Sequence, residues 1–576
     1  MTVRAMEYLV PLPQSPEELA DATWSTLLPY FEAVAAAPLD QHNITDWLAT
    51  WSRLEELVTE AASLSMIAYT CDTTDPAKEA AYLRFSSEIM PLAEEQSVRL
   101  ARRLVESGLA PEGLETVIER FRTSILLFRD ANVPLFAELE ALGAQYQKIT
   151  GGMTAEWEGE RKPLPQLSPF LQHIDRSVRE RAYRASVGPY LETHAELASL
   201  FDEMYARRQK VAANAGFANF RDYIFPAKFR FDYTPEDCLR FHDAVETAVV
   251  PAVARSMVER QRRLGIDRLR PWDLAVNPYR AETLRPYSQP GDLPRIAQQM
   301  FQRLDPELGA DFQRMISEQL LDLESRAGKA PGGYCDTLQA RGRPFIFMNA
   351  SGVLEDVTTL LHEAGHAFHA FASHRQRYIW QRHPGSEAAE LASMSMELLA
   401  GTWLARPVGY LTPEDARRAQ LEHLEDILTS LTHIASVDAY QHWIYTSGSG
   451  HDRAARDAEW LRIRSRFEPG VDWSDLDRER VARWYRQLHI FLYPFYYIEY
   501  GIAQLGALQV WRNSLGEPAG AVGAYRGFLE LGATRSLPEL YSKAGARLIF
   551  DRARMAELVE LVETKASELR EAIDRG

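Results

Sequence analysis

The segment His362–His366 limits what this chain can fold into more than any other, because its sequence His-Glu-Ala-Gly-His needs a regular backbone to bring both imidazoles together. Apolar residues around it recur at three- and four-residue steps, which predicts a helix over residues 354–374. Residues four apart lie on one helix face, with Cβ atoms about 5–6 Å apart, so both histidines can bind one metal ion. Glu363, one residue further round, would face a water on that ion. The segment therefore favours a metal-dependent hydrolase.

The alternative is a core helix whose two histidines only pack and form hydrogen bonds. The chain has 14 histidines in 576 residues, and an accidental match to this motif is expected in roughly a few per cent of such chains. Because a catalytic zinc usually has three protein ligands, a third donor separates the two interpretations. A third histidine in the longer metzincin pattern would fall at position 372, which is Ala372, so that pattern is excluded.

A carboxylate on a following helix is the remaining source of a third ligand. Residues 386–400 have a helical pattern, and three of their acidic residues fall on one face: Glu387, Glu390 and Glu397. From the residues alone, Glu390 and Glu387 are both candidate ligands.

Two segments carry a resemblance to a known family. Residues 356–369, which contain the His-Glu-Ala-Gly-His motif, and residues 390–397, of sequence Glu-Leu-Ala-Ser-Met-Ser-Met-Glu, resemble the thimet oligopeptidase and oligoendopeptidase F family of zinc metallopeptidases, in particular its oligoendopeptidase F-like branch. The resemblance implies one zinc ion held by His362, His366 and Glu390, in preference to the other candidate. It also implies a mainly α, zincin-type (neurolysin-like) helical ellipsoid with a deep central channel and a small β-sheet beside the metal helix.

A downstream segment, residues 489–503, resembles the histidine- and tyrosine-rich region of that family, in which tyrosines at spacings of four and three face the metal. Tyr493, Tyr497 and Tyr500 reproduce those two intervals, and His489 precedes them. The resemblance implies that these four side chains are catalytic, with phenol and imidazole donors that stabilise an oxyanion. The alternative is an aromatic core stripe, because buried tyrosines commonly only pack and form hydrogen bonds.

The region before the metal helix, residues 332–336 and then 344–352, contains a short apolar run bounded by Pro and Gly, which predicts strands. In the resembled family, this region forms a small sheet whose edge receives an extended peptide. Binding through main-chain hydrogen bonds would accept many peptide sequences. The alternative is an ordinary hairpin beneath the site.

Together these features predict a zinc-dependent endopeptidase that hydrolyses internal bonds of short unstructured peptides through a metal-activated water. Glu363 would accept the proton of the water and pass it to the departing amine. Each histidine ligand needs an acceptor for its other ring N–H, and Asp356 or Glu397 could supply it. Two alternatives are an exopeptidase of dipeptidyl type and a non-catalytic zinc-containing protein that binds peptides. Glu363 counts against the second alternative, because a structural site needs no general base.

The composition of the chain limits the classes of partner that we expect it to bind. The net charge of −17 and the pI near 5.4 argue against a nucleic-acid surface, which needs clustered Lys and Arg. Three widely spaced cysteines support neither a disulfide framework nor a thiolate zinc site. No apolar run reaches the roughly 18 residues that span a bilayer, and Met1–Leu12 lacks the pattern of a secretory signal, so we expect a cytoplasmic protein. The oligomeric state, monomer or homodimer, stays open.

The chain is longer than the roughly 250–300 residues at which one core stops growing, so two lobes are expected. A proline-containing stretch over residues 162–169 lies near the seam. We expect an N-terminal helical lobe over residues 1–190 and a catalytic lobe over residues 191–576. Helical patterns are clearest over four further segments: residues 54–69, 91–105, 115–128 and 178–191.

Overall fold

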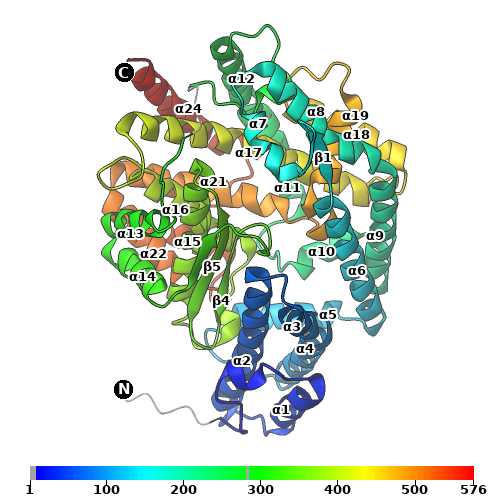
Figure 1. Cartoon of the computed structure of the whole chain (residues 1–576). Helices are drawn as coiled ribbons and strands as arrows, with labels where there is room; N and C mark the ends of the chain where they lie inside the picture. Colours follow the sequence, from blue (N-terminus) through cyan, green and yellow to red (C-terminus); the bar gives the residue numbers. More distant parts are fainter. Residues whose placement is uncertain (1–7, 280–283, 576) are drawn as a thin grey trace. The chain divides into compact units, whose positions relative to one another are not determined.

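The computed structural model describes residues 8–279 and 284–575, and helices dominate it (Figure 1). The mainly α class expected from the sequence is confirmed. The segment assessed for a secretory signal, Met1–Leu12, lies largely outside the described residues. Within the described part of the chain, no helix is both long enough and apolar enough to cross a bilayer.

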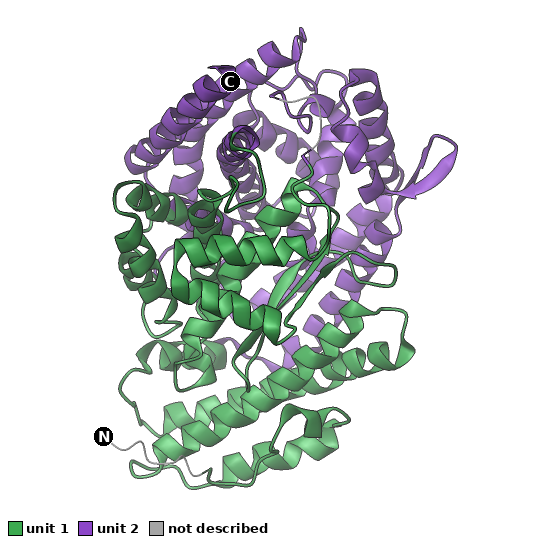
Figure 2. Ribbon diagram, turned by 60° about the vertical axis from the view of Figure 1, so that its left-hand side comes forward, with its two compact units in different colours: residues 1–126, 285–413, 506–548 green, residues 127–284, 414–505, 549–576 purple. Residues whose placement is uncertain are grey.

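The chain forms two compact units, and each is made of three separate segments (Figure 2). Unit 1 comprises residues 1–126, 285–413 and 506–548, and unit 2 comprises residues 127–284, 414–505 and 549–576. These interleaved units differ from the contiguous lobes expected from the sequence, residues 1–190 and 191–576, because packing joins segments that are distant in the chain. The helix α21 (Tyr497–Gly516) contributes about half of its residues to each unit.

In unit 1, helices both precede and follow the three strands of a small sheet along the chain. The elements assigned to it are η1 (Pro16–Leu19), α1 (Trp24–Ala36), α2 (Ile44–Cys71), α3 (Pro76–Leu83), η2 (Arg84–Ile89), α4 (Met90–Glu106), α5 (Glu115–Leu127), α13 (Asp292–Leu304), α14 (Pro306–Ser317), β3 (Leu321–Glu324), β4 (Tyr334–Leu338), β5 (Arg343–Ala350), α15 (Leu354–Ser373), η7 (Ile379–Gln381), α16 (Ser386–Gly401), α22 (Pro518–Leu529) and α23 (Leu537–Lys543).

Unit 2 is also mainly helical, with one two-stranded hairpin. Its elements are η3 (Asp130–Asn132), α6 (Val133–Gly151), β1 (Thr154–Trp157), β2 (Glu160–Pro163), η4 (Leu164–Leu167), α7 (Ser168–Leu171), α8 (Arg176–Glu192), α9 (His194–Asn214), α10 (Phe220–Ala227), α11 (Pro235–Ala244), η5 (Val245–Val249), α12 (Val250–Leu264), η6 (Pro271–Asp273), α17 (Pro413–Thr446), α18 (Arg453–Phe467), α19 (Asp477–Arg486), α20 (Leu488–Leu492) and α24 (Arg552–Arg575).

The four helices expected from periodicity are confirmed as α2, α4, α5 and α8.

The helix α2 shows how the apolar spacing builds the core of unit 1. Trp47, Trp51, Leu54 and Val58 follow one another at steps of four, three and four, and each is at most 2% exposed. Burying a side chain of this size stabilises the fold by about 1.5–3 kcal/mol before the entropic cost of ordering it. The face that these residues form packs against α1, α4 and the segment around Tyr378.

The three-stranded sheet of unit 1 has the order β3-β5-β4. The edge strand β4 runs antiparallel to β5, with Tyr334 opposite Phe347 and Cys335 opposite Ile346. The other edge strand, β3, runs parallel to β5. Both β4 and β5 pack against α15 (Figure 1). The strands predicted over residues 332–336 and 344–352 are therefore confirmed, and they lie beside the predicted metal helix.

Candidate metal centre

A carboxylate in the first turn of α15, that of Asp356, binds the backbone groups that lead into the helix. One oxygen of Asp356, Oδ2, accepts hydrogen bonds from the N–H groups of residues 351–353 at 2.9, 2.7 and 2.9 Å. The hydroxyl of Tyr287 donates to the same oxygen at 2.6 Å. An acidic side chain at the third helical position commonly accepts the N–H of the residue that precedes the helix, as in a capping box. Asp356, considered from the sequence as an acceptor for a histidine, is therefore engaged in fixing the start of α15.

The two helices of the motif approach each other closely at Gly365. A Cβ atom at this position would lie 2.5 Å from the Cα of Ser393 and 2.7 Å from the carbonyl oxygen of Ala392, both on α16. Only a residue without a side chain allows two helix backbones to come this near. The glycine that weakens the helical pattern in the sequence therefore brings α16 against α15 at the level of the two histidines.

This close packing places three donor atoms together. Glu390 Oε2 lies 3.4 Å from His362 Nε2 and 3.7 Å from His366 Nε2. A tetrahedral zinc ion with bonds of about 2.0–2.3 Å holds its donors about 3.3–3.8 Å apart. The three residues form a group whose donor atoms all lie within 4.8 Å of one another. Their spacing and their chemistry fit a single zinc ion with three protein ligands.

The other candidate ligand, Glu387, lies one turn before Glu390 on α16. It is not part of the donor group described above. Its carboxylate instead interacts with Arg120, where burial lowers the pKa of the guanidinium and the charge of Glu387 partly offsets that effect. The structure therefore favours Glu390 as the carboxylate that joins the two histidines.

A second carboxylate on α16 orients one of the imidazoles. Glu397 Oε1 lies 2.6 Å from His362 Nδ1, and this hydrogen bond leaves His362 Nε2 directed toward Glu390. A carboxylate on the outer nitrogen of a ligand histidine fixes its tautomer and increases its basicity as a ligand. Of the two acceptors considered from the sequence, Glu397 is the one that contacts a histidine of the motif.

We expect the substitution Glu397→Gln to weaken zinc binding by about 10- to 100-fold, because the imidazole of His362 would lose its charged acceptor. The dissociation constant is measured by competition with a chromophoric chelator. Glu387→Gln is a matched control, since it changes a buried glutamate on the same helix that is outside the donor group. An unchanged affinity in Glu397→Gln, or a large loss in Glu387→Gln, would contradict these assignments.

Glu363, next to the ligand candidate His362 in the chain, is buried. Its side chain is 8% exposed. The pKa of this carboxyl is raised to about 7, mainly by burial; the charge of His362 opposes the rise, and the charges of Glu390 and Glu397 add to it. Burial also raises the pKa of the Cys335 thiol on β4, and the charge of Glu363 adds to that rise. The edge strand β4 is therefore close to the proposed general base.

The residues expected to bind an oxyanion form a cluster of their own in unit 2. The His489 ring centroid lies 4.8 Å from that of Tyr497, 6.0 Å from that of Tyr500 and 6.1 Å from that of Tyr493. Tyr493 is 54% exposed, and burial raises the pKa of Tyr497. The four side chains thus lie together as expected from the motif. Their action on an oxyanion stays a prediction.

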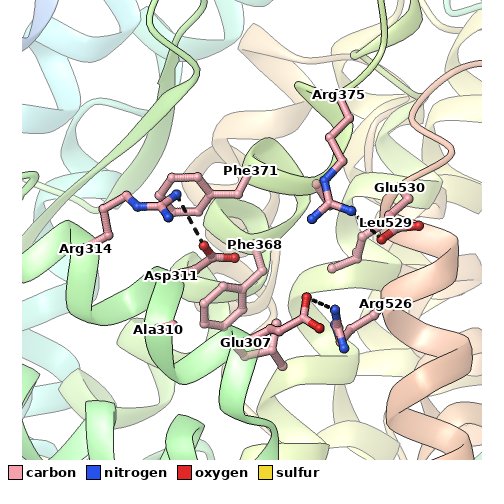
Figure 3. A pocket seen from close by; sticks show the side chains of 12 residues that line it. Glu307, Ala310, Asp311, Arg314, Phe368, Phe371, Arg375, Arg526, Leu529 and Glu530 are labelled. Carbon is pink, nitrogen blue, oxygen red and sulfur yellow. Dashed lines mark hydrogen bonds and ion pairs between the residues drawn. The ribbon is translucent and has the colours of Figure 1, made fainter. Parts of the chain in front are cut away.

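A cavity of ≈ 320 Å³ lies beside α15, and none of the three donor residues lines it (Figure 3). Phe368 and Phe371 line it, and they follow His366 by two and five residues, which places them on the other side of the helix. Its charged groups are paired with one another, as in the ion pairs of Arg375 with Glu530 and of Arg526 with Glu307. This cavity therefore has no part in the candidate metal centre.

The sequence matches known family models over most of its length. Residues 170–560 match the model of peptidase family M3, and residues 23–123 match the model of the peptidase M3 N-terminal domain. The first match contains all the candidate site residues described above.

Individual relatives agree with the family match. The chain is 24% identical to oligopeptidase PepF of Bacillus subtilis over 396 residues, which cover 65% of this chain and 55% of the relative. It is 21% identical to an oligoendopeptidase F homolog of Lactococcus lactis, over 71% of this chain and 66% of the relative. Its fold is similar to that of a PZ peptidase A solved with an inhibitor, with a TM-score of 0.87 and 27% identity over 98% of this chain and 99% of that one. The chain thus spans just over half the length of the first of these relatives.

Proposed function

The chain belongs to peptidase family M3, and we propose that it is a zinc-dependent endopeptidase that hydrolyses internal bonds of short unstructured peptides. The observation that carries this proposal is the group of His362, His366 and Glu390, with the buried carboxylate of Glu363 next to it. Family membership implies a metal cofactor, and the choice of zinc rests on the donors, two imidazoles and one carboxylate. The relatives named oligopeptidase and oligoendopeptidase support peptides as the substrate class. The cytoplasmic location expected from the sequence stays a prediction.

In the proposed reaction, each side chain has one task. A zinc ion at this site would lower the pKa of its bound water and polarise the scissile carbonyl. Glu363 would accept the proton of the attacking water at its carboxylate and later donate it to the leaving nitrogen of the peptide. Glu397 would keep the imidazole of His362 in the tautomer that presents Nε2 to the metal.

We propose that the backbone of the substrate peptide binds along the edge strand β4. It forms an edge of the three-stranded sheet, and its residue Cys335 is close enough to Glu363 for their charges to interact. A peptide added to this edge would make main-chain hydrogen bonds that do not depend on its side chains. We further propose that Tyr497, Tyr500 and His489 donate hydrogen bonds to the oxyanion that forms from the scissile carbonyl, with Tyr493 beside them.

Removal of the metal is the direct test of this proposal. With an internally quenched fluorescent peptide of about ten residues as substrate, we expect 1,10-phenanthroline to abolish cleavage and added zinc to restore it. Mass spectrometry of the products identifies the cleaved bond. Cleavage that persists in the metal-free protein would overturn the proposal.

The products also separate the proposed function from its two alternatives. Release of terminal dipeptides alone would show an exopeptidase. Tight peptide binding without any product, at full zinc occupancy, would show a non-catalytic binding protein. Internal cleavage by the zinc-loaded protein is the outcome that we expect.

A further inference from the structure

A second group of potential metal ligands lies in unit 2, on the helices α11 and α17. Cys238 and His242 are four residues apart on α11, and Asp438 and His442 are four residues apart on α17. Each pair therefore lies on one face of its helix. His242 Nε2 lies 2.8 Å from Asp438 Oδ2, so the two helices meet at these faces. The donor atoms of Cys238, Asp438 and His442 all lie within 4.8 Å of one another.

The cluster is removed from solvent. Cys238 and Asp438 are 0% exposed, and His242 and His442 are each 3% exposed. Aromatic rings surround the imidazole of His442, with the ring centroid of Phe495 at 5.4 Å. Burying polar groups in such surroundings destabilises the fold wherever a group has no partner.

Several polar atoms of the cluster have no hydrogen-bond partner among the described residues. These atoms are Asp438 Oδ1 and both ring nitrogens of His442. His442 Nε2 lies 3.4 Å from Asp438 Oδ2, within ion-pair distance but without the alignment of a hydrogen bond. His242 contacts Asp438 Oδ2, so the other carboxylate oxygen, Oδ1, is buried without a partner. Buried polar groups nearly always have partners, so these atoms indicate a missing one.

We propose that Cys238, Asp438 and His442 bind a second zinc ion, which has a structural role and joins α11 to α17. A thiolate and a carboxylate together carry two negative charges, so a divalent ion would leave the buried site neutral. Thiolate and imidazole are ligands that zinc favours over magnesium or calcium. His242 would hold the Asp438 carboxylate in place from outside, in the same way that Glu397 holds His362 in the candidate metal centre.

The alternative is a hydrogen-bonded cluster of two histidines and an aspartate that holds no metal. It accounts for the contact between His242 and Asp438 but leaves the second imidazole and the second carboxylate oxygen without partners. A metal ion supplies the partner that both of these groups lack.

Metal analysis of the full chain tests this proposal without any measurement of activity. Protein purified without a polyhistidine tag is stripped, reloaded with zinc, dialysed and analysed by mass spectrometry for metal. We expect about two zinc ions per chain in the wild type and about one in the double variant H362A/H366A, which lacks the candidate catalytic ligands. Cys238→Ser should lose the other ion, whereas Cys71→Ser, which changes a cysteine outside both groups, should retain both.

A second measurement covers the case in which Cys238→Ser does not fold. The double variant H362A/H366A, with Cys71 and Cys335 also changed to serine, has Cys238 as its single thiol. After cobalt loading, we expect the near-ultraviolet thiolate-to-cobalt charge-transfer absorption and a higher midpoint of thermal unfolding than in the metal-free protein. The proposal would be overturned by a wild type with about one zinc ion, an H362A/H366A variant that holds none, and a single-thiol variant that shows no thiolate band after cobalt loading.

Discussion

Glu363→Gln is expected to reduce the turnover of an internally quenched peptide by about 10²- to 10⁴-fold while the zinc content stays unchanged. The amide has nearly the shape of the carboxylate, but it cannot accept a proton from the attacking water. Because Glu363 is adjacent to His362 and is not one of the three donors, its replacement should leave the metal in place. Turnover is measured by stopped-time fluorescence and zinc by mass spectrometry on the same samples.

The matched control for this substitution is Glu355→Gln. Glu355 is an exposed glutamate in the first turn of the same helix, so its replacement changes the charge of α15 without touching the donors. We expect its turnover to stay within about twofold of the wild type, since surface substitutions rarely change stability by more than about 0.5 kcal/mol. Full activity in Glu363→Gln with zinc bound would remove the general base from the proposed reaction.

Gly365→Ala is expected to have the second large effect, on zinc affinity and stability together. The new methyl group would lie 2.5 Å from the backbone of Ser393, so α15 and α16 must move apart. Overpacking of this kind costs about 1–3 kcal/mol. Glu390 lies one turn before Ser393 on α16, so the same movement would draw its carboxylate away from the histidines of α15. Chemical denaturation gives the stability, and competition with a chelator gives the affinity.

Gly523→Ala separates this steric effect from the general effect of removing a glycine. Gly523 lies within α22 of the same unit, and a Cβ atom there meets nothing within 4 Å. Its replacement should increase stability by about 0.5–1 kcal/mol, because alanine favours the helix. Equal behaviour of the two variants would show that α15 and α16 tolerate a wider separation than their contact at Gly365 indicates.

The parts of the site that the sequence predicts are those set by local spacing. His362 and His366 share a face because they are four residues apart on one helix, and this follows from helix geometry alone. The choice of Glu390 over Glu387 depends on how α16 packs on α15, and that packing depends on the contact at Gly365. Periodicity marks Gly365 only as a weak helix former, so the sequence gives no sign of this contact.

The second cluster, on α11 and α17, cannot be predicted from local spacing. Its two pairs, on α11 and α17, each have the spacing of four that was informative at the metal helix. His242 and Asp438 are nevertheless 196 positions apart in the chain, and no motif connects them. The chain has no Cys-x-x-Cys pair, which excludes the familiar thiolate zinc sites but not a site with one cysteine. Only the tertiary fold brings the two pairs together.

The composition of unit 1 from three separate segments has a consequence for how the protein is made. The ribosome releases residues 285–413, which contain both helices of the candidate centre, long before residues 506–548, which complete the same unit. Contacts between such distant segments form late, because the entropy of closing a long loop must be overcome first. The nascent chain would therefore complete the unit that holds the candidate metal centre near the end of synthesis, and an isolated fragment around the motif would not fold as an independent domain.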